Sequence, residues 1–406
     1  MSVQAAHRGA PSATLRTNRA ATTAVFALNG LVFGAWAGRI PDVKARLGLT
    51  ESLLGVLLLV AALGALAGMQ VVARAVARWG TPRVTTTGVV AVSVLLLPIA
   101  FAPSPAVLAA ALVVFGMAMG FLDVAMNSHG VWVEERYGRP IMSSLHAFFS
   151  LGLLAGAGIS GLAARAEVSA TASIAANGVV LAAAAAWACS RLSGGPEPAG
   201  DDATSAADSA TPWPRAKVLL LGVMAFITLM AEGAANDWSA VLLHEERGVS
   251  TALAVSGLVA FNATMTVGRL LGDRVTLAWG PGPTLRRSSA VACVGMLAGL
   301  VVPGAVAAVV GFALMGIGLS VAVPILFSAA GALPGGTPGQ SIARVSTLGY
   351  LGFLVGPTAI GFLADATSLT LAFGAAVALL AFVVLGAPAT AGRRQAQPAP
   401  ADAVAA

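Results

Sequence analysis

The chain has 406 residues, of which 57% are hydrophobic and 10% are charged. Soluble domains carry about 25% charged residues, so this composition excludes a soluble globular protein and a largely disordered one. The formal net charge is +6, but the arginines lie between apolar runs and form no basic patch, so we expect no nucleic acid partner.

Twelve apolar segments follow one another along the chain. A helix needs about 20 mostly apolar residues to cross a bilayer, and each segment approaches or exceeds that length. This pattern predicts an all-α integral membrane protein with twelve transmembrane helices. The predicted spans are 19–38, 52–73, 84–101, 105–128, 141–164, 169–190, 217–243, 252–272, 287–303, 305–327, 341–364 and 369–387.

A polar segment divides these spans into two sets of six. Residues 191–216 combine glycine and proline with Asp201, Asp202 and Asp208 among Ser, Thr and Ala, which is typical of a flexible linker. The predicted organisation is a cytoplasmic N-terminal tail (1–18), an N-terminal six-helix half (19–190), a central cytoplasmic linker (191–216), a C-terminal six-helix half (217–387) and a disordered cytoplasmic tail (388–406).

The two halves share residues at a constant offset of 200 positions. The matched pairs are Gly48 with Gly248, Gly68 with Gly268, Arg74 with Arg274, Gly80 with Gly280, Gly116 with Gly316, and Gly152, Gly156 and Gly161 with Gly352, Gly356 and Gly361. One ungapped offset at equivalent places in equivalent spans predicts a parallel internal repeat.

Basic residues predict the orientation. With both termini in the cytoplasm, sixteen of the 23 Lys and Arg residues lie inside. Five lie outside, at Arg39, Lys44, Arg46, Arg165 and Arg247, and Arg269 and Arg344 lie within spans. Cytoplasmic loops carry an excess of Lys and Arg, so we expect a multi-pass protein of the cell inner membrane with both termini cytoplasmic.

Ionisable residues inside the spans mark the candidate functional groups, because charge in a bilayer is costly. Asp123 and Glu232 are the candidate proton-coupling carboxyl groups, and His146 is either a proton relay or a satisfied core histidine. Arg269 and Arg344 are interpreted as structural latches near span ends. The spans 84–101, 169–190, 287–303 and 369–387 have no ionisable interior residue and are predicted to face lipid.

Helical spacing places further polar residues on shared faces. Stripes of this kind are formed by Gly116, Gly120, Asp123 and Asn127, by Glu232, Asn236 and Ser239, by Asn262, Thr266 and Arg269, and by Asn29, Phe33 and Trp36. We expect these stripes to line a cavity. The candidate substrate-binding residues are Asn29, Trp36, Asn127, Asn236 and Asn262, although Trp36 also fits an interfacial aromatic belt.

Twelve spans, a central loop and a six-plus-six repeat resemble the major facilitator superfamily. The signature loop of that family, G-x-x-x-D-R-x-G-R-R, is partly retained by Arg78 and Gly80 after the second span and by Asp273 and Arg274 in the second copy. In the first copy, Ala73 and Ala77 replace its Gly and its Asp. The resemblance implies that these four retained residues act in gating.

Four further stretches are similar to the YbjJ/MosC-like branch, which is related to the fucose permeases. They are residues 39–44, 120–127, 139–148 and 232–239. In fucose/proton symporters a carboxylate in the fourth span takes part in proton coupling, and Asp123 is the matching position. Their first-span carboxylate has no counterpart here, where Asn29 is the nearest polar residue.

These observations predict a secondary transporter that moves a small solute by alternating access, coupled to protons and selective for a sugar- or cyclitol-like substrate. The alternative is proton-driven efflux of an amphipathic compound, and a non-transporting receptor would require a folded soluble domain that the sequence lacks. No enzymatic activity, cofactor or metal ion is expected, and the chain is expected to act as a monomer in the lipid bilayer.

Overall fold

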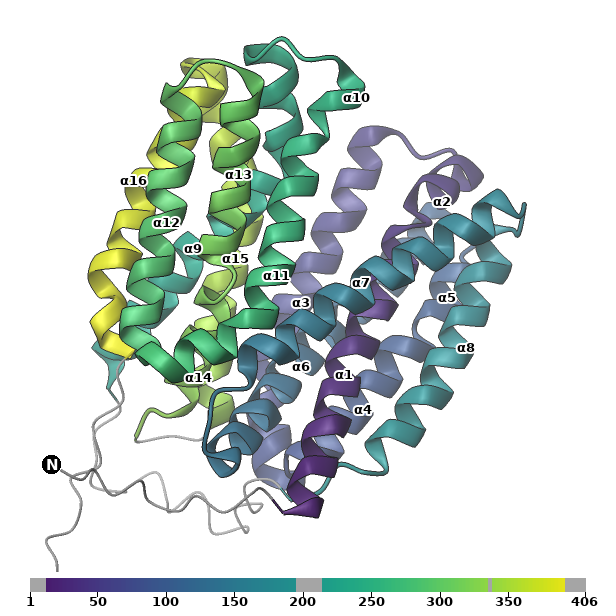
Figure 1. Ribbon diagram of the computed structural model, residues 1–406. Coiled ribbons are helices and arrows are strands. Elements are labelled where there is room, and N and C mark those ends of the chain that lie inside the picture. The colour runs from purple at the N-terminus through teal and green to yellow at the C-terminus, as the bar shows by residue number, and fades with distance from the viewer. Residues whose placement is uncertain (1–11, 195–213, 335–337, 391–406) are drawn as a thin grey trace, which may run out of the picture.

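The computed structural model describes residues 12–194, 214–334 and 338–390, and every regular element in these ranges is helical (Figure 1). The helices are α1 (Ala13–Ala37), α2 (Ile40–Leu47), α3 (Glu51–Trp79), α4 (Thr81–Val94), α5 (Leu96–Ala100), α6 (Pro105–Tyr137), α7 (Met142–Arg165), α8 (Ala170–Cys189), α9 (Arg215–Val241), α10 (Thr251–Ala254), α11 (Ser256–Trp279), α12 (Pro281–Val301), α13 (Ala305–Leu319), α14 (Ala322–Gly331), α15 (Pro338–Ala366) and α16 (Leu369–Gly386). A π-helical turn (Leu242–Glu246) follows α9, and a 3-10 turn (Ala387–Thr390) follows α16.

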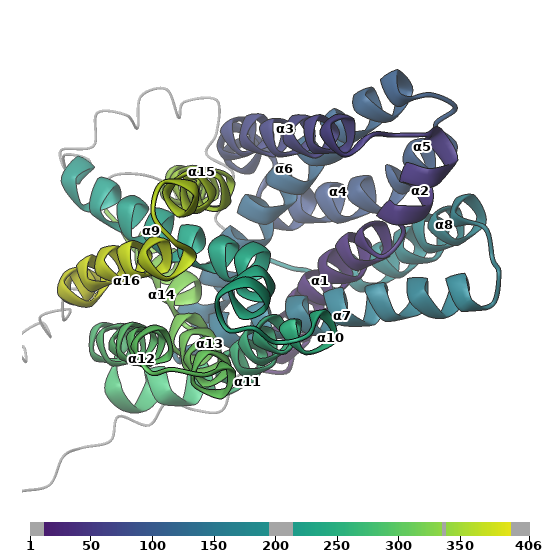
Figure 2. The same ribbon diagram turned by 90° about the horizontal axis from the view of Figure 1, so that it is seen from above.

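The helices form two groups, which Figure 2 shows from above. In the first group (α1–α8), α1 packs along α7 and α3 packs along α6; in the second (α9–α16), α9 packs along α15 and α11 along α13. The groups meet chiefly where α7 contacts α11 and where α3 contacts α15. We name the two ends of the molecule after the short helices that lie there: the α14 end, where α1 begins, and the α10 end opposite (Figure 1).

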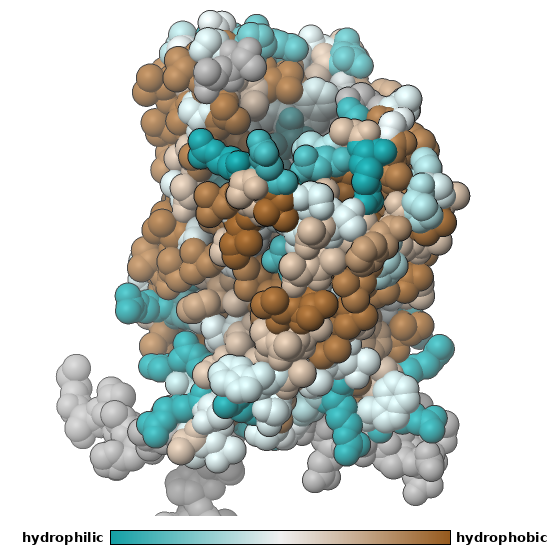
Figure 3. Space-filling view, turned by 90° about the vertical axis from the view of Figure 1, so that its right-hand side faces the viewer, coloured by the Kyte–Doolittle hydropathy of each residue, from teal (hydrophilic) through white to brown (hydrophobic). Residues whose placement is uncertain are grey.

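The predicted multi-pass helical architecture is confirmed. Among the described residues, eleven helical segments are long and apolar enough to cross a membrane. The predicted span 252–272, which corresponds to α11, is not among them, because α11 carries Asn262, Arg269, Asp273 and Arg274 within its 24 residues. On the face that Figure 3 shows, the middle is largely hydrophobic and the hydrophilic side chains gather toward both ends, as expected for a protein that crosses a bilayer.

Two pairs of glycines related by the 200-residue offset have matching surroundings. Gly80 and Gly280 both have positive φ, at 76° and 81°, in the turns before α4 and α12. A Cβ atom added at Gly116 would overlap the backbone oxygen of Ala61, and one added at Gly316 would overlap that of Phe261, which is again 200 positions away. These two pairs of shared glycines therefore serve the same turn and the same close helix contact in both groups.

Three of the predicted spans are interrupted, at Leu95, at Val255 and at residues 320–321, and a proline explains the first and the third of these breaks. The proline ring clashes with the carbonyl group four residues earlier, which disfavours an uninterrupted helix at that point. Pro98 lies four residues after Val94, the last residue of α4. Pro324 lies four residues after Ser320, where α13 gives way to α14.

Several helices extend past the predicted span limits. The first begins at Ala13, where the Ser12 hydroxyl accepts a hydrogen bond from the Leu15 backbone at 3.2 Å, so residues 13–18 belong to α1 and not to a tail. The helix α6 continues to Tyr137 and ends at Gly138, whose φ is 68°. The predicted linker lies largely outside the described residues, as does the predicted C-terminal tail after Thr390.

Glycines at the α1–α7 contact provide a test of this packing. A Cβ atom added at Gly156 would overlap the backbone oxygen of Leu31, whereas one added at Gly158 of the same helix would meet no atom within 4 Å. Overpacking costs about 1–3 kcal/mol, and more where backbone must move. We therefore expect Gly156→Leu to lower the melting temperature and membrane abundance, while Gly158→Leu leaves both near the wild-type values. Equal stability of the two variants, measured on detergent-purified protein, would contradict close α1–α7 packing.

Candidate functional site

The helix α6 places Asp123 and Asn127 one turn apart on a buried face. The Asn127 side-chain amide donates hydrogen bonds to the Asp123 backbone oxygen at 2.8 Å and to its Oδ1 atom at 3.3 Å. The Oδ1 atom of Asn127 lies 3.0 Å from Nε2 of His146 on α7. Because this amide directs its NH2 group to Asp123, its oxygen faces His146, and the histidine Nε2 donates the proton of that hydrogen bond.

Arg269 connects the two groups of helices. Its side chain is buried on α11, its Nη1 atom donates a hydrogen bond to the Ser150 hydroxyl of α7 at 2.8 Å, and its Nη2 atom lies 3.5 Å from Oε1 of Glu232 on α9. The Ser150 hydroxyl in turn donates to the His146 backbone oxygen at 3.2 Å. Arg269 was interpreted from the sequence as a latch near a span end, and the structure places it among the site residues.

The polar stripes predicted on α9 and α11 face each other. Asn262 donates a hydrogen bond to Oδ1 of Asn236 at 2.9 Å, and Asn236 donates to the Glu232 backbone oxygen at 3.0 Å. A continuous series of polar contacts thus crosses the molecule, which we name the polar network. Its members are Asp123, Asn127, His146, Ser150, Arg269, Glu232, Asn236 and Asn262.

Tyr350 of α15 adds a phenol to this network. Its hydroxyl group forms a hydrogen bond with the Asp123 carboxyl group and also interacts electrostatically with the Glu232 carboxylate. Asp123 therefore has neutral hydrogen-bonding neighbours in Asn127 and Tyr350, whereas Glu232 has the Arg269 guanidinium. The two carboxyl groups lie in different electrostatic surroundings.

Two candidate substrate-binding residues lie apart from the polar network. Asn29 packs between α1 and α6, where its amide donates to the Met126 sulfur at 3.6 Å and its Oδ1 atom is buried without a hydrogen bond. Trp36 is 4% exposed. That burial argues against the aromatic-belt interpretation of Trp36, because a belt residue faces lipid.

The loop-motif residues gather at the α14 end. Arg78 is exposed and stacks on Trp79 at 5.8 Å, Gly80 forms the positive-φ turn, and Arg274 is exposed. Asp273 of α11 reaches the other group of helices, where its carboxylate accepts hydrogen bonds from the Ser143 and Ser144 backbone at 2.9 and 3.1 Å.

Two carboxylates cap the first turn of α7. Glu134 of α6 accepts from the Ile141 and Met142 backbone at 2.8 and 3.0 Å, and Asp273 accepts from the next two amides. These four N–H groups have no partner within the helix, and negative charge is favourable at a helix N-terminus. Glu134 also interacts with Ser328 of α14, so both carboxylates connect the two groups at this end.

Removing one cap should loosen the start of α7. Hydrogen bonds to charged groups contribute about 1.5–3 kcal/mol, so we expect Asp273→Ala to speed amide hydrogen exchange at Ser143 and Ser144 about 10- to 100-fold. Mass spectrometry of the peptide that contains both amides measures the rate. The matched control is Asp237→Ala, which removes an exposed carboxylate of α9. Unchanged exchange in Asp273→Ala would show that these hydrogen bonds do not hold the helix end.

Ser150, Tyr350 and Glu134 were missed by the sequence analysis. Ser150 follows His146 by one helical turn, so the spacing used for the other stripes could have found it. Tyr350 is one of only two tyrosines in the chain, and it falls within the predicted span 341–364. Glu134 lies beyond the predicted end of its span and gave no signal of burial.

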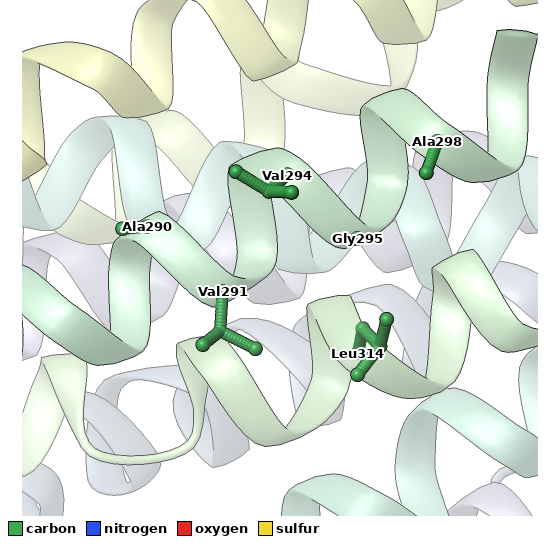
Figure 4. Close-up of a pocket in the computed structure, with 6 residues that line it drawn as sticks. All are labelled: Ala290, Val291, Val294, Gly295, Ala298 and Leu314. Atoms are coloured by element: carbon green, nitrogen blue, oxygen red, sulfur yellow. The ribbon is translucent and has the colours of Figure 1, made fainter.

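A groove of about 430 Å³ lies between α12 and α13 (Figure 4). It is lined by apolar residues alone, namely Ala290, Val291, Val294, Gly295, Ala298 and Leu314. Val294 is 68% exposed. Because no polar group is present to orient a hydrophilic solute, this groove is suited to contact with lipid and not to solute recognition.

The polar network has the composition of a solute-binding site in a membrane. It combines two carboxyl groups, one guanidinium and several amides and hydroxyls, which can both donate and accept hydrogen bonds. Polar groups buried in apolar surroundings are costly and mark solute or ion pathways. Residues of both groups of helices contribute, so a relative movement of the groups would change the site.

Comparison with known proteins agrees with this architecture. The family model of the Major Facilitator Superfamily matches residues 22–337. A protein of Yersinia pestis named as an uncharacterized MFS-type transporter is 36% identical over 374 residues, which cover 92% of this chain and 96% of that protein. The membrane protein MosC of Rhizobium meliloti is 33% identical over 346 residues, which cover 85% and 83% of the two chains.

Solved structures share the fold at low sequence identity. The transporter FucP in the outward conformation superimposes with a TM-score of 0.78 at 15% identity, covering 93% of this chain and all of that one. The proton:xylose symporter XylE gives a TM-score of 0.70 at 12% identity and covers 91% and 95%. The chain belongs to the major facilitator superfamily of membrane transporters, and is not an enzyme.

Proposed function

We propose that this protein is a proton-coupled transporter of a small, sugar- or cyclitol-like solute that works by alternating access. The observation that carries the proposal is the polar network, in which the Arg269–Ser150 hydrogen bond joins residues of both groups of helices. A hydroxylated solute fits this network because each hydroxyl group can donate to a carboxylate or amide oxygen and accept from an amide or guanidinium.

The names of two structural neighbours support proton coupling. FucP of E. coli is a fucose:proton symporter, and XylE is a proton:xylose symporter. In the proposed mechanism, Asp123 carries the coupled proton, Glu232 is the second candidate, and His146 assists Asp123. The solute is bound by Asn127, Asn236 and Asn262, with Asn29 and Trp36 on the first helix.

The proposed architecture is twelve transmembrane helices in two six-helix repeats, with α11 as the span too polar to be recognised by hydropathy. The matched glycine contacts of the two groups support this count. The carboxylate caps on α7 close the α14 end, whereas the surface is recessed among hydrophilic side chains toward the α10 end (Figure 3). Arg78, Gly80, Asp273 and Arg274 act in closing and opening the α14 end.

Orientation follows from the same proposal and can be measured directly. The α14 end is assigned to the cytoplasm and the chain to the inner membrane as a monomer, since this end holds most of the arginines. We expect reporter tags at both termini and within 191–216 to respond as cytoplasmic, and a tag beside Lys44 as periplasmic. A periplasmic signal from the central segment would contradict six spans on each side of it.

Transport in proteoliposomes tests the function. Purified protein is reconstituted, a pH gradient is imposed, and proton flux is recorded against a panel of sugars, cyclitols and cationic dyes. We expect one or more neutral hydroxylated solutes to accelerate proton entry. Proton flux driven only by the dyes would replace this proposal with efflux of amphipathic compounds, and flux unaffected by any solute would refute proton-coupled transport of these classes.

A further inference from the structure

His146 lies between two buried phenylalanine rings from other helices. Its ring centroid is 5.3 Å from that of Phe26 on α1, in an edge-to-face arrangement, and 6.1 Å from that of Phe327 on α14. Phe26 is 0% exposed, Phe327 is 1% exposed and His146 is 8% exposed. Three rings from three helices, one of them in the second group, thus fill one level of the molecule.

This level lies at the end of the polar network that is nearest to the α14 end. His146 is near the first turn of α7, which begins at that end, and Phe327 belongs to α14 itself (Figure 1). Asn127, which accepts the hydrogen bond of His146, follows Asp123 by one turn along α6 toward the same end. Ser150 and Arg269 lie on the other side of His146, one turn further along α7.

The surrounding helices are closed at this level. Val131 of α6 packs so tightly against α14 that a Cβ atom at Gly331 would come within 2.6 Å of its side chain. A Cβ atom at Gly272 of α11 would likewise come within 2.6 Å of the Ser143 hydroxyl oxygen on α7. Opening the α14 end requires these contacts to separate, and the same movement must part Phe327 from His146, because the two residues lie on opposite groups of helices.

We infer that Phe26, His146 and Phe327 form the inner gate of the transport pathway, and that Asn127 holds the His146 ring in the gate. This inference rests on the proposed alternating access. His146 is then a positioning residue of the gate and not itself the proton carrier. Its hydrogen bond to Asn127, which also bonds Asp123, connects the gate to the residue assigned to proton coupling.

Cysteine accessibility tests the gate. The free cysteines Cys189 and Cys293 are replaced by alanine, and Asn262→Cys supplies a reporter two turns from Arg269 on the α10 side of the gate. A membrane-impermeant maleimide is applied to right-side-out and to inverted vesicles. With an intact gate we expect the reporter to be labelled from the α10 side and protected from the α14 side.

Phe327→Ala should open the protected route. Removing the ring eliminates its aromatic contact and leaves a space, so labelling from the α14 side should accelerate about tenfold or more while labelling from the α10 side stays unchanged. The matched control is Phe312→Ala, which truncates another fully buried phenylalanine of the second group, paired with Phe373 at 5.4 Å. Labelling from the α14 side that is no faster in Phe327→Ala than in Phe312→Ala would overturn the gate.

Two further variants separate the parts of the inference. His146→Ala should accelerate labelling from the α14 side as Phe327→Ala does, which keeps the test available should Phe327→Ala fail to fold. Asn127→Leu replaces the amide with an apolar side chain of the same branched shape and removes the hydrogen bond, so it should also accelerate labelling. Unchanged labelling would refute the positioning role of Asn127. Labelling needs neither a proton gradient nor a solute, so the gate and the proposed proton coupling can fail independently.

Discussion

Asp123→Asn is expected to abolish proton-driven accumulation of the solute while exchange of solute across the membrane persists. Asparagine keeps the size and hydrogen-bonding capacity of the side chain but cannot take up and release a proton. One charge moving through 100 mV contributes about 2.3 kcal/mol, which corresponds to about a 50-fold concentration ratio for one proton per solute. The variant should reduce that ratio to about one, measured as labelled solute retained in energised vesicles.

The control for this variant is Asp237→Asn, which makes the same chemical change at an exposed carboxylate of α9. Its accumulation should match that of the wild type. Accumulation retained by Asp123→Asn at normal protein level would move the coupling role to Glu232. Loss of exchange together with accumulation would instead indicate that Asp123 holds the solute or the fold.

The spans were predictable because hydropathy records what the bilayer requires of each helix. It does not record where a helix ends, and the polar first turns of α1 and the last turns of α6 were therefore missed. His129 is an example: it is 0% exposed, but it lies one residue beyond the predicted span 105–128, so it was not identified as a buried ionisable residue. The breaks before Pro98 and Pro324 had a signal in the sequence, because each falls four residues before a proline.

The site was partly predictable for a related reason. Helical periodicity places Asp123 with Asn127, and Glu232 with Asn236, because these pairs lie on single helices. It carries no information about which helices are neighbours, so the contact of Arg269 with Ser150 and the approach of Tyr350 to Asp123 depend on tertiary structure. The predicted span ended at residue 272, whereas α11 extends to Trp279, so Arg269 lies farther from the end of its helix than the sequence indicated.

Arg269→Gln is expected to be strongly destabilising and to eliminate transport. The guanidinium is the cation nearest to Glu232 in the polar network, and the two side chains are only 11% and 16% exposed. Removing one partner of a buried pair costs about 3–5 kcal/mol, because the remaining charge is left uncompensated. We expect a lower melting temperature in detergent and no solute uptake. Arg287→Gln, which alters an exposed arginine stacked on Trp279 at 4.6 Å, should change neither.

A second substitution distinguishes loss of the charge pair from loss of packing. The double variant combines Arg269→Gln with Glu232→Gln, so neither charge remains. It therefore lacks the uncompensated Glu232 carboxylate that destabilises the single variant. The double variant should therefore melt at a higher temperature than Arg269→Gln alone, although transport stays absent because the Ser150 hydroxyl has lost its cationic partner on α11. If the double variant is no more stable than the single one, the charge of Glu232 is compensated elsewhere, and Arg269 acts chiefly through its contact with α7.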